Sequence, residues 1–118
     1  MSFYGRTVDL KDDPNLVEAY KEYHRNVWPE VEEQLRKLGV TKMRIFLLGR
    51  HLFMYMEAPD TFDPDAFDVQ WLEEPRCVAW EEIMEHYFAP LPEARPGEWW
   101  LAMEPIYDFT TSPGVSPR

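Results

Sequence analysis

An apolar hairpin near the middle of the chain reads Met43-Arg44-Ile45-Phe46-Leu47-Leu48-Gly49-Arg50-His51-Leu52-Phe53-Met54-Tyr55-Met56-Glu57. The apolar runs on either side of Gly49 predict two strands, and the Gly-Arg-His segment between them indicates a turn. Side chains alternate between the faces of a strand, so Ile45 and Leu47 face one side while Phe46 and Leu48 face the other. The hairpin therefore predicts a sheet that needs a cover on both faces.

The sequence before the hairpin predicts one strand and one interrupted helix. Residues 3–10 are rich in strand-forming residues. Over residues 16–38, apolar and aromatic side chains recur at steps of three and four, which is the pattern of one helix face. Pro29 predicts a kink or a break near residues 26–28, because proline lacks a backbone N–H and clashes with the preceding turn. Gly39 is expected to end the helix.

The sequence after the hairpin begins with residues 57–74, which hold seven acidic side chains and no basic one. We expect a loop there, with a short helix near residues 65–72. A second helix is expected over residues 75–87. Prolines then predict an extended linker, and residues 99–109 predict a last strand, in which Pro105 indicates an edge or a bulge.

The predicted order of elements is strand, helix, strand, strand, helix, strand. This is the βαββαβ pattern of a ferredoxin-like α+β domain, which has an antiparallel sheet with helices on one face. We expect residues 1–109 to form this single domain and residues 110–118 to form a flexible tail. The second apolar face of the sheet predicts a homodimer in which two sheets pack face to face.

Composition limits the class of partner. The 118 residues have a mass of 14.1 kDa and are 45% hydrophobic and 15% aromatic, which indicates one small globular domain with aromatic side chains available for a pocket or an interface. A formal net charge of −10 opposes binding to nucleic acid or to an anionic membrane, so we expect neither partner. The single cysteine, Cys77, excludes an intrachain disulfide. With no leader-like or membrane-spanning apolar stretch, we expect a cytoplasmic protein.

Short catalytic motifs are absent: the chain has no phosphate-binding glycine loop, no zinc-protease motif and no serine-nucleophile motif. The three histidines, His24, His51 and His86, are far apart in the sequence and show no metal-ligand spacing. Nothing in this spacing indicates a metal site, although ligation by a histidine together with carboxylates that meet in space stays open.

The most informative motif is Tyr20-x-x-x-His24-x-x-x-Trp28 within the predicted helix. These three side chains stand one turn apart on the same side of a helix. Tyr20 and His24 take the place of aliphatic residues in the apolar stripe and so direct a phenol and an imidazole inward. They are either core residues hydrogen-bonded to the backbone, or a pocket with an acid–base group beside a hydroxyl donor. The pattern leaves both interpretations open.

Tryptophans give a second indication of a pocket. Trp80 lies in the second predicted helix, and Trp99 and Trp100 are expected to point to opposite faces of the last strand. An indole ring is either plain core or a platform for the C–H face of a sugar or another flat ligand. Glu81, next to Trp80, is most simply a solvated helix carboxylate.

Three segments are distinctive in combination. They are Tyr20-x-x-Tyr23-His24-x-x-Val27-Trp28-Pro29-Glu30-Val31, the strand segment Leu52-Phe53-Met54, and Leu91-Pro92-x-x-x-Pro96-Gly97-Glu98-Trp99-Trp100-x-x-Met103-Glu104. Together they resemble the L-rhamnose mutarotase family over residues 4–109. The resemblance implies a ferredoxin-like domain that pairs into a dimeric α/β barrel. It also implies interconversion of the α and β anomers of a free 6-deoxy sugar without a metal or an organic cofactor.

The resemblance further implies roles for individual residues. The proton-donating histidine of the family falls on His24, its substrate-contacting helix tyrosine on Tyr20, and the first residue of its Trp-Trp pair on Trp80. Two positions depart from the family. Met43 stands where a tyrosine is common, and Glu81 stands in place of the second tryptophan. Both would border the sugar, so these departures bear on substrate preference.

The sequence leaves alternatives open for both the substrate and the class of protein. Residues 8–14 look more like family members linked to L-fucose use, so we expect a cofactor-independent mutarotase acting on L-rhamnose or L-fucose. A second hypothesis is another dimeric α/β-barrel enzyme, such as a cofactor-free oxygenase acting on an aromatic substrate. A third is a non-catalytic small-ligand-binding domain in which Tyr20 and His24 only pack.

Overall fold

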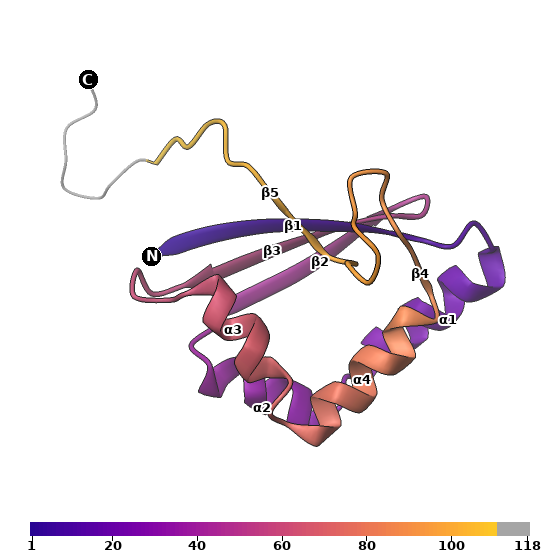
Figure 1. The fold of residues 1–118 in the computed structure, drawn as a ribbon, viewed down its shortest axis with the longest axis horizontal. Coiled ribbons are helices and arrows are strands. Elements are labelled where there is room, and N and C mark those ends of the chain that lie inside the picture. Colours follow the sequence, from indigo (N-terminus) through magenta and orange to yellow (C-terminus); the bar gives the residue numbers. More distant parts are fainter. Residues whose placement is uncertain (111–118) are drawn as a thin grey trace.

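The structure, a computed structural model, describes residues 1–110, so residues 111–118 of the predicted tail lie outside it. One sheet is covered by helices on one face (Figure 1). The elements follow in the order β1 (Ser2–Leu10), α1 (Pro14–Arg25), α2 (Pro29–Lys37), β2 (Lys42–Leu48), β3 (His51–Ala58), α3 (Pro64–Trp71), α4 (Pro75–Glu85), β4 (Phe88–Ala89) and β5 (Leu101–Met103). The strand order is β2-β3-β1-β4, with β5 also paired to β1 and every pair antiparallel. The predicted α+β class is confirmed.

The predicted hairpin is confirmed as β2 and β3, in which Phe46 pairs with Phe53 and Leu47 pairs with Leu52. Gly49 in the turn has a φ of +61°, a conformation that glycine adopts without a steric penalty. The other edge of β3 pairs with β1. The two long strands β1 and β3 therefore form the centre of the sheet.

The predicted interruption of the first helical stretch is confirmed as a complete break between α1 and α2. Asp13 caps α1 by accepting a hydrogen bond from the backbone N–H of Asn15, and Pro14 occupies the first turn. Pro29 begins α2, where its missing N–H is not needed. Because α1 stops at this break, His24 lies in its last turn.

The last strand predicted over residues 99–109 is confirmed only for Leu101–Met103, which form β5, and its predicted length is wrong. The two-residue strand β4 follows α4 closely, and β5 is only three residues long. Pro90 directly follows β4 and Pro105 comes two residues after β5, and a residue without an N–H cannot extend a ladder of hydrogen bonds. Trp99 and Trp100 precede β5 and do not lie in a strand. Both pack against Phe88, with ring centroids at 6.0 and 5.8 Å.

The sheet buries one face and leaves the other open. Val8 and Leu52 face the helices and are buried. The opposite face carries Phe3, Phe46 and Phe53, which are 46%, 54% and 38% exposed. Apolar side chains therefore occupy both faces of the sheet, as the hairpin predicts. Among the described residues, no helix has the length and the apolar character needed to cross a membrane.

Candidate active site

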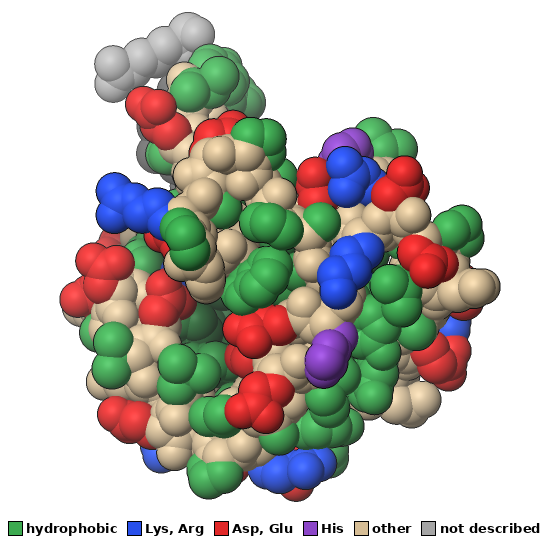
Figure 2. Space-filling view, turned by 45° about the vertical axis from the view of Figure 1, so that its right-hand side comes forward, with side chains coloured by type: hydrophobic (Ala, Val, Ile, Leu, Met, Phe, Trp, Pro, Cys, Tyr) green, Lys and Arg blue, Asp and Glu red, His purple; other side chains and the backbone are tan. Residues whose placement is uncertain are grey.

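A cavity of about 560 Å³ opens between the helices and the inner face of the sheet. In the space-filling view, hydrophobic side chains lie within a hollow and acidic side chains gather at its edge (Figure 2). The cavity is lined by all five residues that the sequence analysis selects, which are Tyr20, His24, Met43, Trp80 and Glu81. The fold thus brings together residues from α1, β2 and α4.

His24 is held by its own helix. Its Nδ1 atom lies 2.8 Å from the backbone oxygen of Tyr20. A carbonyl oxygen only accepts hydrogen bonds, so Nδ1 carries the hydrogen and Nε2 of the neutral ring keeps a free lone pair. Burial lowers the pKa of His24, and the bond to the Tyr20 carbonyl opposes this only in part. At neutral pH the imidazole is therefore uncharged, and Nε2 is a base.

Tyr20 lies beside this base, with its ring centroid 4.3 Å from that of His24. The side chain is buried, and burial together with the negative charge of Glu81 raises the pKa of Tyr20 far above its ordinary value. The phenol therefore stays protonated at any physiological pH. It can donate a hydrogen bond to a ligand hydroxyl but is not a base.

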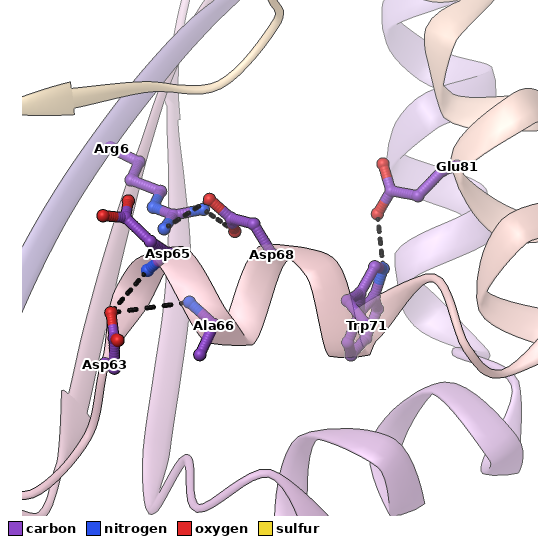
Figure 3. A network of polar contacts seen from close by, with 7 residues as sticks. All are labelled: Arg6, Asp63, Asp65, Ala66, Asp68, Trp71 and Glu81. Carbon is purple, nitrogen blue, oxygen red and sulfur yellow. Dashed lines mark hydrogen bonds and ion pairs between the residues drawn. The ribbon is translucent and has the colours of Figure 1, made fainter.

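Glu81 is turned into the cavity, so its interpretation as a solvated carboxylate is wrong. The Nε1–H of Trp71 on α3 donates to Oε1 of Glu81 on α4 across 3.1 Å (Figure 3). Burial raises the pKa of Glu81, the hydrogen bond from Trp71 lowers it, and the charges of Glu85 and Asp68 raise it further. The carboxyl therefore holds a proton more readily than an ordinary glutamate does.

The sequence analysis did not find Trp71 or the ion pair between Arg6 and Asp68. In that pair the guanidinium of Arg6 on β1 binds both carboxylate oxygens of Asp68 on α3, at 2.8 and 3.3 Å (Figure 3). All three residues line the cavity. The only sequence signal was the spacing of Phe67 and Trp71 within the acidic segment, because two aromatics four residues apart indicate a helix face turned inward.

The remaining aromatic residues divide between wall and core. Trp80 lines the cavity and packs edge-on against His24, at 5.5 Å between ring centroids. Trp99 and Trp100 line another part of the wall. Trp28 is absent from the lining; it packs against Trp80 and lies under the guanidinium of Arg76 at 3.9 Å. The third member of the Tyr-His-Trp motif therefore supports the site from outside.

The electrostatics of the cavity favour an uncharged ligand. Its lining includes the carboxyl groups of Glu32, Asp68, Glu81 and Glu85. Arg6, the one guanidinium in the lining, is paired with Asp68. The negative charge of these carboxyl groups would repel an anionic ligand. A polyhydroxyl compound could instead donate hydrogen bonds to several of them and pack against the apolar rings. Within residues 1–110, no three His, Cys, Asp or Glu side chains are grouped so that they could hold a metal ion.

An antiparallel sheet with helices on one face and a cavity that combines an imidazole, a phenol and a carboxyl group define a small acid–base site for a neutral ligand. The model of the L-rhamnose mutarotase family matches residues 4–109 of the chain. The chain therefore belongs to the L-rhamnose mutarotase family, whose members are isomerases of sugar anomers.

Individual relatives agree with this assignment. A UPF0734 protein of Dictyostelium discoideum is 46% identical over 90% of this chain and 88% of its own length. An L-fucose mutarotase of Xanthomonas campestris pv. campestris is 38% identical over 92% of this chain and 88% of its own length. The crystal structure of an L-rhamnose mutarotase from Formosa agariphila superposes with a TM-score of 0.69, covers 93% of this chain and 100% of its own, and shares 20% sequence identity. At that identity the superposition supports the fold alone.

Proposed function

We propose that this protein interconverts the α and β anomers of a free 6-deoxy-L-sugar, L-fucose or L-rhamnose, with His24 as its acid–base residue. The observation that carries the proposal is the neutral imidazole at the cavity wall, with Nδ1 bonded to the backbone and Nε2 available as a base. Family membership favours this activity over the oxygenase and the non-catalytic alternatives.

Anomer exchange needs only proton transfers and one reversible bond cleavage. A base removes the proton of the O1 hydroxyl, an acid protonates the ring oxygen, and the C1–O5 bond breaks as the C1 carbonyl forms. Rotation about C1–C2 and the reverse steps give the other anomer. General acid–base catalysis contributes roughly 10²–10⁴-fold. Because mutarotation already proceeds in water, an acid–base site without a nucleophile is chemically sufficient.

The sugar would be recognised by the mixed lining of the cavity. Tyr20 supplies a hydroxyl donor, and Glu81 supplies an acceptor for ring hydroxyls. The indole rings of Trp80, Trp99 and Trp100 provide apolar surface for the C–H face and the methyl group of a 6-deoxy sugar.

We propose L-fucose as the better of the two sugars. Met43 and Glu81 line the cavity, where the family resemblance places a tyrosine and a tryptophan beside the sugar. Losing a phenol and gaining a carboxyl changes which ring hydroxyls find partners. The relative named L-fucose mutarotase is 38% identical to this chain, and a relative named L-rhamnose mutarotase, from Lactiplantibacillus plantarum, is 31% identical.

We also propose that the protein is a homodimer, formed through the open face of the sheet, and that it acts in the cytoplasm. Phe46 stacks on Phe53 at 6.1 Å between ring centroids, and Phe3 stacks on Tyr55 at the same separation. Gly5 lies between them, and a Cβ there would approach Phe53 to 3.1 Å. These rings form a flat apolar surface that a second copy would cover. The buried thiol of Cys77 suits a reducing compartment.

The activity is tested by NMR exchange spectroscopy on equilibrated L-fucose and L-rhamnose. Catalytic amounts of the protein should speed exchange between the anomeric resonances beyond the spontaneous rate, and exchange should be faster for L-fucose. A protein that leaves both sugars at the spontaneous rate does not have this function.

A further inference from the structure

We infer that Glu81 is a second proton-transfer residue, working opposite His24, and that Trp71 is the residue that positions it. This inference rests on the proposed mutarotase function. Glu81 lies on α4 and His24 lies on α1, and both line the same cavity. Two proton-transfer groups on separate helices can address the two oxygens of an anomeric centre at once.

The geometry leaves one carboxyl oxygen free for a ligand. Trp71 donates its Nε1–H to Oε1 of Glu81, and among residues 1–110 this is the one hydrogen bond that the structure gives to the carboxyl. Figure 3 shows the Glu81 side chain extending from α4 toward the indole of Trp71, with its other oxygen directed elsewhere. The hydrogen bond restrains the rotation of the carboxyl group without using its second oxygen.

Among residues 1–110, no cation is paired with the carboxyl of Glu81 to hold it in its charged form. The nearest guanidinium in the lining, that of Arg6, is bound to Asp68 on α3. Glu85 on its own helix and Asp68 on α3 raise the pKa of Glu81, and Glu81 in turn raises the pKa of the Tyr20 phenol on α1. A partly buried carboxyl with one neutral donor and two acidic neighbours holds a proton more readily than an exposed one. A purely structural role would not need an ionisable group there, since glutamine accepts the same hydrogen bond.

Burial also brings the pKa values of the two groups closer together. Burial raises the pKa of Glu81 and lowers that of His24, so the two values move toward one another. Proton transfer in a catalytic step is most efficient when donor and acceptor have pKa values near the working pH. The same burial therefore keeps a larger fraction of Glu81 protonated, and so able to donate, and keeps His24 available as a base.

The proposed step is balanced in protons and electrons. Nε2 of His24 takes the proton of the O1 hydroxyl while the protonated carboxyl of Glu81 gives its proton to the ring oxygen. The electron pair of the C1–O5 bond goes to O5, and the C1–O1 bond becomes a carbonyl. After rotation about C1–C2, the carboxylate of Glu81 takes the proton back as O5 attacks C1, and the imidazolium returns its proton to O1. At the end of each cycle, both residues have returned to their initial protonation states.

The test compares Glu81→Gln with Glu82→Gln by NMR exchange spectroscopy across pH. Glutamine keeps the size of the side chain and the acceptor for Trp71 but carries no acidic proton. Glu82 is the exposed neighbour outside the cavity, and its replacement removes the same charge. We expect Glu81→Gln to lower kcat about 100-fold, with KM changed little, and to turn a two-sided pH–rate profile into a one-sided one. Glu82→Gln should keep the wild-type profile.

Trp71→Phe tests the positioning role separately, because it keeps the carboxyl group. The Trp71 hydrogen bond lowers the pKa of Glu81, so its loss should move the limb of the pH–rate profile that belongs to Glu81 to higher pH. If Glu81→Gln keeps the activity and the pH–rate profile of the wild type, this inference is overturned and the proposed function stands. A wild-type protein that speeds exchange of neither sugar overturns the proposed function and this inference with it.

Discussion

The ring of His24 is bonded to the backbone oxygen of Tyr20, 2.8 Å from Nδ1, and not to the Tyr20 phenol. The four-residue spacing of α1 supplies this contact, since positions i and i+4 face each other on a helix. The helix therefore sets the tautomer and the orientation of the imidazole by itself. The phenol of Tyr20 remains free to serve a ligand.

Replacing His24 tests the base directly. His24→Asn should lower the rate of anomer exchange by two or more orders of magnitude and leave the fold intact, because asparagine cannot accept and return a proton at neutral pH. His86→Asn is the matched control, since His86 is exposed and does not line the cavity. NMR exchange spectroscopy measures the rates, and circular dichroism checks the fold. Near-native exchange in His24→Asn would remove this residue from the mechanism.

The acid limb of the pH–rate profile should have its midpoint below the ordinary histidine pKa of about 6.5. The neutral imidazole is the base, so activity falls as protonation sets in, and burial lowers the pKa at which this happens. For the same reason, His24 contributes stability above the unfolded-state pKa that is lost as pH falls toward its folded-state pKa. An NMR titration of the imidazole should give the same midpoint as the kinetics. A midpoint above 6.5 would contradict the buried, neutral base.

A charge on the open face of the sheet should separate the dimer. In Phe46→Glu, two carboxylates would be brought into an apolar interface, where a charge without a partner is costly. Sedimentation at micromolar concentration should give twice the 14.1 kDa chain mass for wild type and the single-chain mass for the variant. Val69→Glu is the control, because Val69 is 68% exposed but lies on α3, on the helix-covered side. A wild-type protein that sediments as a monomer argues against a dimeric barrel.

The residue at position 81 should set the ratio of rates on L-fucose and L-rhamnose. Glu81→Trp removes the carboxyl group, so both rates should fall, and the rate on L-fucose should fall further. A hydrogen bond between neutral groups is worth roughly 0.5–1.5 kcal/mol, which corresponds to about twofold to tenfold discrimination. The two rates are compared in one competition experiment by NMR. If the ratio is the same in wild type and variant, Glu81 does not select the sugar.

The parts of the fold that follow from neighbouring residues could be predicted from the sequence. The alternation around Gly49 specified the hairpin, and the apolar stripe of α1 and α2 specified a helix that Pro29 interrupts. Tyr20 and His24 could be singled out because both stand in that stripe, one turn apart, and the family resemblance then assigned them to the site. Periodicity, turn chemistry and the missing N–H of proline all act over a few residues, so they can be recognised in the sequence alone.

The parts that depend on packing between elements were decided by the tertiary structure. Glu81 looked like a surface carboxylate, and only the approach of α3 to α4 places the Trp71 N–H against it and turns it into the cavity. The side of the cavity on which Trp99 and Trp100 lie follows from their contacts with Phe88, which no local pattern encodes. The environment of Glu81, and hence its pKa, arises from burial between helices. The sequence determined which groups the site contains, and the packing of elements decided which of them face one another, because burial and hydrogen bonding are properties of neighbours in space.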